Sequence, residues 1–102
     1  MRGEKVARIY FEDFRLQVIR HVREIEAAAP ESHSPEWFLL RYLRRIIKAA
    51  EAPTSPGRVE GSIRSLIRFY VDNVDAGSDM GERCNFIYKE YRRTLRENQE
   101  QE

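Results

Sequence analysis

Residues 34–51 read SPEWFLLRYLRRIIKAAE, and this stretch carries the signals that decide the fold. The hydroxyl of Ser34 can accept a hydrogen bond from a backbone N–H of a first helical turn. Pro35 suits the first helical position, where the N–H that proline lacks would have no helical partner. The apolar residues that follow recur at helical spacing and gather on one face. The stretch therefore predicts an amphipathic helix over 35–51.

Similar signals divide the rest of the chain into further segments of helical length. Ser55 and Pro56 repeat the start signal. Gly77 is expected to end a helix in the left-handed conformation, and Ser78 or Asp79 to cap the next one. Apolar residues recur at helical spacing in every segment, and no stretch alternates with period two. The predicted helices cover 4–28, 35–51, 56–75 and 79–98.

These segments predict an all-α fold, a single-domain antiparallel four-helix bundle. Connections of a few residues make sequential helices antiparallel, and apolar stripes of similar length then close on one another. In segment 56–75 the predicted core stripe includes Val71 and leaves Phe69 outside. A chain of 102 residues has no room for a second core. The domain is expected to span 1–98, and the polar tail 99–102 is expected to fray.

Composition and charge exclude several classes of protein. The 18 Lys and Arg residues nearly balance the 17 Asp and Glu residues, for a net charge of +1. No apolar segment approaches the roughly 20 residues that cross a bilayer, and the N-terminal stretch has no signal-peptide core. The one cysteine, Cys84, supports neither an internal disulfide nor a cysteine-rich zinc site. We therefore expect a cytoplasmic protein without a membrane partner or a cofactor.

Two sets of basic residues repeat the spacing i, i+3, i+4 and i+7 and so lie on one face of their helices. The first basic stripe is Arg41, Arg44, Arg45 and Lys48, and the second basic stripe is Lys89, Arg92, Arg93 and Arg96. Like charges at this spacing repel, which suggests that a partner supplies negative charge. Arginine suits phosphate and carboxylate, and Phe86 beside the second stripe could stack on a base. The alternative is a solvated or internally paired surface.

Another set of apolar residues lies outside the predicted core stripes. Ile9, Leu16 and Ile19 fall on the far side of the first helix, and Phe38 and Tyr42 widen the apolar arc of the second. These residues predict an interface with a protein partner or with a second copy of the chain. The alternative is a less regular bundle that buries them.

An acidic cluster flanks the junction of the last two helices. Its members are Asp72, Asp75, Asp79 and Glu82. Paired carboxylates on adjacent helices can hold Mg²⁺ for phosphate chemistry, whereas the alternative is ordinary helix capping and solvation. His21 and Cys84 fall on apolar arcs and are expected to be packing residues. No complete set of catalytic residues is present.

These patterns together predict a non-enzymatic interaction module without a small-molecule substrate. It would serve as a small subunit or regulator of a larger assembly, binding a protein or an anionic surface such as RNA or DNA backbone through its basic stripes. An acidic protein face is the other candidate for that surface. The alternative function is a Mg²⁺-dependent enzyme acting on a nucleotide or phosphoester through the acidic cluster.

Overall fold

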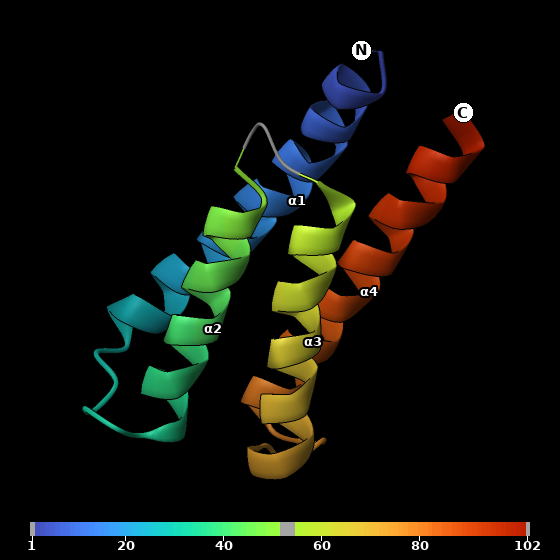
Figure 1. Cartoon of the computed structure of the whole chain (residues 1–102). Coiled ribbons are helices and arrows are strands. Elements are labelled where there is room, and N and C mark those ends of the chain that lie inside the picture. Colours follow the sequence, from blue (N-terminus) through green and yellow to red (C-terminus); the bar gives the residue numbers. More distant parts are fainter. Residues whose placement is uncertain (1, 52–54, 102) are drawn as a thin grey trace.

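The computed structural model is a bundle of helices that run alternately up and down (Figure 1). It describes the backbone of residues 2–51 and 55–101, and the side chains of residues 11–51 and 55–98. Within these ranges the chain forms helices and loops but no strand, which confirms the predicted all-α bundle. The helices are α1 (Arg2–Ala27), α2 (Pro35–Ala49), α3 (Pro56–Asn73) and α4 (Asp79–Gln101).

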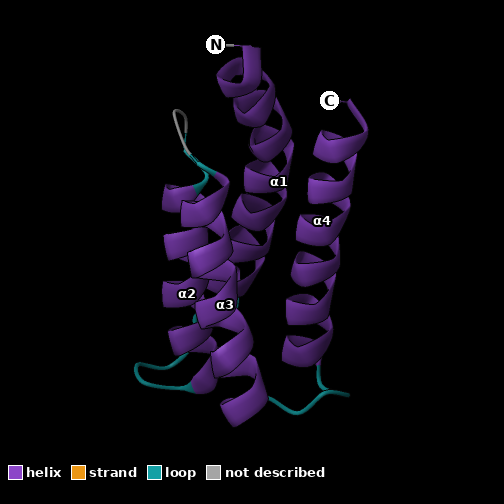
Figure 2. Ribbon diagram, turned by 45° about the vertical axis from the view of Figure 1, so that its right-hand side comes forward, coloured by secondary structure: helices purple, strands orange, loops and turns teal. Residues whose placement is uncertain are grey.

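The helices follow one another around the bundle in chain order. α2 packs against α1 and α3, and α4 packs against α1, so that α2 and α4 lie diagonally across the bundle. α3 and α4 pack least closely of the neighbouring pairs. Figure 2 shows the loops from α1 to α2 and from α3 to α4 at the same end of the bundle. The outer face of α2 therefore points away from α4.

Serine side chains begin three of the helices. Ser34 Oγ accepts from Trp37 N at 3.2 Å, and Ser55 Oγ accepts from Arg58 N at 3.4 Å. Ser78 Oγ accepts from Gly81 N at 3.1 Å in the first turn of α4. The predicted serine caps are confirmed, because each satisfies a backbone donor that has no helical acceptor.

The predicted left-handed C-cap at Gly77 is wrong. α3 ends at Asn73, Val74 leaves the helix in an extended conformation, and no glycine of the described residues has a positive φ. Extended backbone suits the β-branched Val74, whose side chain packs against the core. The left-handed residues are Ala29 (φ 50°) and His33 (φ 67°), both in the α1–α2 connection.

The observed starts of α2, α3 and α4 equal the predicted ones, whereas the other helix ends differ by one to three residues. α2 ends at Ala49 and α3 at Asn73, two residues before the predicted ends, and α1 begins two residues earlier than predicted. α4 continues through residues 99–101, which sequence analysis assigned to a frayed tail, while residue 102 lies outside the described residues. Glu, Gln and Arg are good helix formers, so a polar tail can propagate the helix that precedes it.

The core is built from the predicted apolar stripes, but α3 is rotated about its own axis relative to the prediction. Phe69 is buried and stacks on Tyr42 of α2 with ring centroids 4.9 Å apart, whereas Val71 is 71% exposed. α3 is thus turned further toward α2 than its apolar pattern predicted. The fully buried core side chains come from all four helices and include Phe11, Phe14, Leu39, Leu43, Ile46, Ile63, Leu66 and Ile87.

Candidate anion-binding surface

The first basic stripe lies on the outer face of α2. All four side chains, Arg41, Arg44, Arg45 and Lys48, are exposed. The opposite face of the same helix buries Leu39, Leu43 and Ile46 in the core. The structure thus brings the four predicted residues together on one side of a helix.

Aromatic rings support two of these arginines. The Arg41 guanidinium lies 5.4 Å from the centroid of the Trp37 ring, and the Arg45 guanidinium lies 5.3 Å from that of Tyr42. Both rings also contact another aromatic ring: His33 lies 4.7 Å from Trp37, and Phe69 lies 4.9 Å from Tyr42. A cation over an aromatic face is attracted to the ring quadrupole, which favours these arginine positions.

Trp37 and His33 were not among the predicted residues of this site, although their spacing in the sequence places them beside its arginines. His33, Trp37, Arg41 and Arg45 follow one another at intervals of four residues. Side chains four residues apart are neighbours on a helix surface. The same spacing that revealed the basic stripe therefore also predicts that Trp37 lies beside Arg41.

The first stripe retains most of its positive charge. Arg44 pairs with Glu26 of α1 at 2.6 Å, and both side chains are about half exposed. Arg41, Arg45 and Lys48 have no carboxylate partner among residues 11–51 and 55–98. An exposed pair such as Arg44–Glu26 contributes little and is screened by salt. The outer face of α2 therefore offers uncompensated cations to an anionic ligand.

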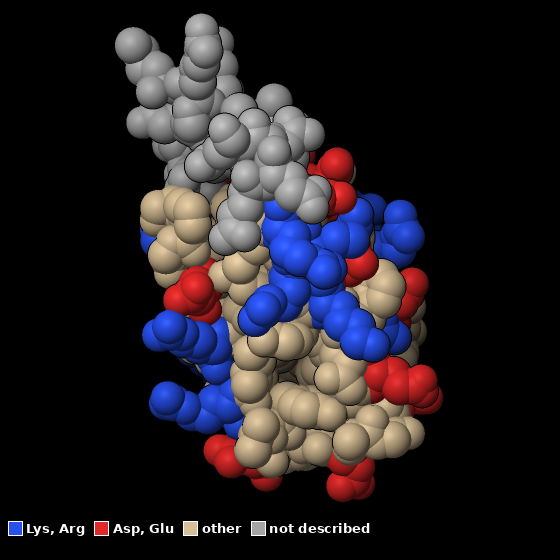
Figure 3. Space-filling view, turned by 90° about the vertical axis from the view of Figure 1, so that its right-hand side faces the viewer, with Lys and Arg blue, Asp and Glu red and all other residues tan. Residues whose placement is uncertain are grey.

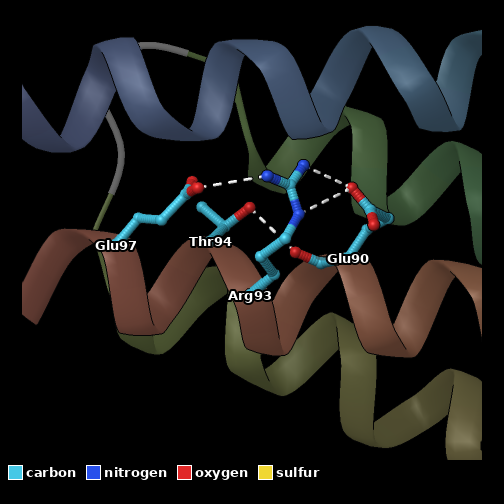
Figure 4. A network of polar contacts seen from close by, with 4 residues as sticks. All are labelled: Glu90, Arg93, Thr94 and Glu97. Carbon is cyan, nitrogen blue, oxygen red and sulfur yellow. Dashed lines mark hydrogen bonds and ion pairs between the residues drawn. The ribbon is translucent and has the colours of Figure 1, made fainter.

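Two arginines of the second basic stripe, on α4, have partners within their own helix. Arg93 lies between two carboxylates of its own helix, 2.6 Å from Glu90 and 3.1 Å from Glu97 (Figure 4). The hydrogen bond from Arg93 holds the pKa of Glu90 below its ordinary value. Arg92 instead donates to the hydroxyl of Tyr88 at 3.3 Å. The alternative of an internally paired surface therefore holds for Arg93, which Glu90 and Glu97 neutralise.

Lys89 and Arg96 complete the second stripe and are exposed. Phe86, which we expected beside these cations as a free stacking platform, packs on another helix instead. Its ring lies 5.3 Å from the ring of His21 in α1, and the side chain remains 47% exposed. The ring of Phe86 is thus partly covered by a contact within the chain.

His21 belongs to a polar cluster between α1 and α4. Arg83 Nη1 lies 2.7 Å from His21 Nδ1 and 2.7 Å from Glu24 Oε1. Burial lowers the pKa of His21, and the nearby positive charge of Arg83 lowers it further. Neutral His21 can accept the hydrogen bond from Arg83 at Nδ1. The predicted packing role of this half-buried histidine thus includes an interhelical contact.

The predicted apolar interface is only partly an exposed surface. Leu16 is 51% exposed and Ile19 is half-buried, while the side chain of Ile9 lies outside the described residues. Phe38 and Tyr42 pack against the core of their own chain. The wide apolar arc of α2 is therefore used within the bundle, as the alternative of a less regular packing anticipated.

The acidic residues at the α3–α4 junction lie in solvent. Asp72, Asp75, Asp79 and Glu82 are all exposed, and no three or more His, Cys, Asp or Glu side chains of the described residues form a group that could hold a metal ion. The structure therefore offers no support for the magnesium alternative. Burial raises the pKa of the Cys84 thiol to about 11, which keeps it protonated and weakly nucleophilic.

None of the described helices is long and apolar enough to span a bilayer. Comparisons with protein-family models, with curated proteins and with solved structures give no match.

Proposed function

We propose that this protein is a non-enzymatic interaction module whose first basic stripe binds the backbone of single-stranded nucleic acid. The observation that carries the proposal is the state of the four cations on α2. Three of them have no carboxylate partner in the described part of the chain, and two lie over aromatic rings. Such a surface combines uncompensated charge with guanidinium planes, held over aromatic rings, on which unpaired bases can stack.

Single-stranded nucleic acid fits this surface better than an acidic protein does. An arginine stacked on an aromatic ring has already lost part of its rotamer freedom, so less entropy is lost when it contacts a phosphate or stacks on a base. A rigid duplex offers no unpaired bases, and an acidic peptide offers no bases at all. The net charge of +1 limits the proposal to a local footprint on α2.

We also propose that this module belongs to a larger assembly and works in the cytoplasm. A small bundle with an exposed basic face on α2 suits a small subunit or regulator of a larger assembly. The free, buried Cys84 agrees with a reducing compartment.

Trp37 makes the proposal testable without a label on the protein. It is the one tryptophan of the sequence and lies beside Arg41. We would titrate the protein with a fluorescein-labelled 12-nucleotide oligouridylate and follow both RNA anisotropy and Trp37 fluorescence. The proposal predicts that both signals change with one midpoint, because the ligand lies over the α2 face.

A matched pair of variants tests where the RNA binds. The test variant replaces Arg41, Arg44, Arg45 and Lys48 by Gln. The control variant replaces four exposed arginines elsewhere, Arg20, Arg23, Arg58 and Arg68, by Gln, so that both lose the same net charge. We expect about a 100-fold loss of affinity in the test variant and less than about threefold in the control, since removing several phosphate contacts costs orders of magnitude. Equal losses, or tighter binding of a 12-residue oligoglutamate than of the RNA, would overturn the proposal.

A further inference from the structure

An apolar groove runs between α3 and α4, where the helices pack least closely. Its volume is about 240 Å³, and its walls include Ile67, Tyr70 and Val71 of α3 and Cys84 and Tyr88 of α4. Val71, at 71%, is the most exposed large apolar side chain among residues 11–51 and 55–98. Figure 3 shows this face as a hollowed area of uncharged residues. The groove is distinct from the α2 face, which lies across the bundle.

Charges of opposite sign lie at the two ends of the groove. At the end toward the start of α3 and the second half of α4, Arg64 and Arg92 are exposed, and Arg64 forms an exposed ion pair with Glu60 of its own helix at 2.8 Å. At the other end, Asp75 and Glu82 are exposed. Figure 3 shows basic side chains above the hollowed area and acidic ones at its lower edge. Arg92 is held at the rim by its hydrogen bond to Tyr88.

These charges flank the lining residues in both walls of the groove. In α4 the wall includes Cys84 and Tyr88, and Glu82 precedes Cys84 by two residues while Arg92 follows Tyr88 by four. In the other wall, Arg64 precedes and Asp75 follows the lining residues of α3. A surface with an apolar centre and opposite charges at its two ends is complementary to a second copy turned end over end.

The charges also select one of the two simple ways in which a second copy can pair with this face. A two-fold axis parallel to the helices would place the basic end of one copy on the basic end of the other. An axis perpendicular to the helices places Arg92 of one copy opposite Glu82 of the other, and Arg64 opposite Asp75. Opposite charges across an interface fix its register, and like charges oppose the wrong one.

We propose that the α3–α4 face binds a second copy of this chain, forming a dimer in which α3 and α4 each cross their own copies antiparallel. The chain exposes 6993 Å². A typical monomer of its mass exposes about 6,000 Å², although the elongated shape of the bundle accounts for part of the excess. A standard interface covers about 800 Å² of each partner. The α2 faces point away from this interface, so each dimer presents two of them.

Two charge reversals test the pairing. We would measure the mass of the wild-type chain, of Arg92→Glu, of Glu82→Arg and of their equimolar mixture by sedimentation equilibrium. The wild type is expected at twice its chain mass of 12.1 kDa, and each variant alone as a monomer, because reversal sets like charges opposite each other. The mixture restores both attractive contacts and is expected to dimerise. A pairing of basic end on basic end would also let the mixture associate, but it predicts a monomeric wild type.

Two further variants show whether a loss of dimerisation comes from the interface or from misfolding of the chain. The double variant Arg92→Glu/Glu82→Arg carries both reversals in one chain and is expected to dimerise with itself. Val71→Asp places a charge at the apolar centre and is expected to be monomeric, with a helical circular dichroism spectrum equal to that of the wild type because Val71 is exposed. A monomeric wild type, dimers of either single variant, or a mixture that stays monomeric while its components are folded would overturn the proposal.

Discussion

Arg45 in α2 and Arg93 in α4 hold the same position in their basic stripes but have different neighbours. Three residues before Arg45 stands Tyr42, whose ring the guanidinium covers at 5.3 Å. Three residues before Arg93 stands Glu90, and four residues after it stands Glu97; both form ion pairs with it. The identical spacing of the cations thus produces an uncompensated surface on one helix and a neutralised one on the other. What decides between them is the residue one turn away.

The largest effect on stability that we expect lies in the first turn of α4. A Cβ at Gly81 in α4 would lie 2.4 Å from the backbone oxygen of Asp75 and 2.8 Å from that of Ala76, because the α3–α4 loop crosses this turn. We expect Gly81→Ala to lower the free energy of unfolding by about 2 kcal/mol, although alanine normally favours a helix. Urea denaturation measures the change.

Gly61 in α3 is the matched control for this prediction. A Cβ added there would meet nothing within 4 Å. Gly61→Ala is therefore expected to raise the free energy of unfolding by about 0.5–1 kcal/mol through helix propensity. If both alanine variants were stabilised, the close approach of the loop to Gly81 would be refuted.

A smaller effect, on the melting temperature and its dependence on salt, is expected to distinguish Arg93 from Arg45. Replacing Arg93 by Gln removes two ion pairs within α4, so we expect a fall in melting temperature of about 2 °C or less that disappears in 1 M salt. Replacing Arg45 by Gln removes a contact with a ring rather than with a carboxylate, and its effect on melting temperature should not depend on salt in this way. Melting curves at low and high salt would show a common salt response if the two arginines had equivalent surroundings.

The smallest expected effect concerns His21, between α1 and α4. Its pKa is lowered in the folded chain, so the unfolded chain binds more protons as the pH falls through about 6.5. The contribution of neutral His21 to stability is therefore complete above this pH, and it is lost as the pH falls toward the pKa of His21 in the folded chain. We expect His21→Gln to flatten the dependence of melting temperature on pH between about 7.5 and 5.5. An unchanged slope would mean that His21 does not contribute through its protonation.

The helices, their serine caps and most of the core could be predicted from local signals. Ser34 and Ser55 act within four residues, and apolar periodicity identifies the inner face of each helix. The rotation of α3 could not be predicted in this way, because Phe69 and Val71 are both apolar and only the neighbouring helices decide which one is buried. The contact of Phe86 with His21 likewise depends on how α1 and α4 meet.

The candidate site was predictable to a similar extent. Arg41, Arg44, Arg45 and Lys48 lie on one face because helical spacing alone requires it. The neutralisation of Arg93 was also within reach of the sequence, since Glu90 and Glu97 stand at the helical distances of three and four residues. The pair between Arg44 and Glu26 was not, because these residues are 18 positions apart on different helices.

The dependence of RNA affinity on salt tests the central claim most directly, which is that the α2 face binds phosphates. The affinity of the wild type for the 12-nucleotide oligouridylate would be measured between about 50 and 200 mM salt. Four phosphate contacts predict a slope of about −3 in log affinity against log salt concentration, and the variant with Gln at the four α2 positions should lose most of it. A slope that is the same in both proteins, or an affinity that does not change with salt, would contradict the account.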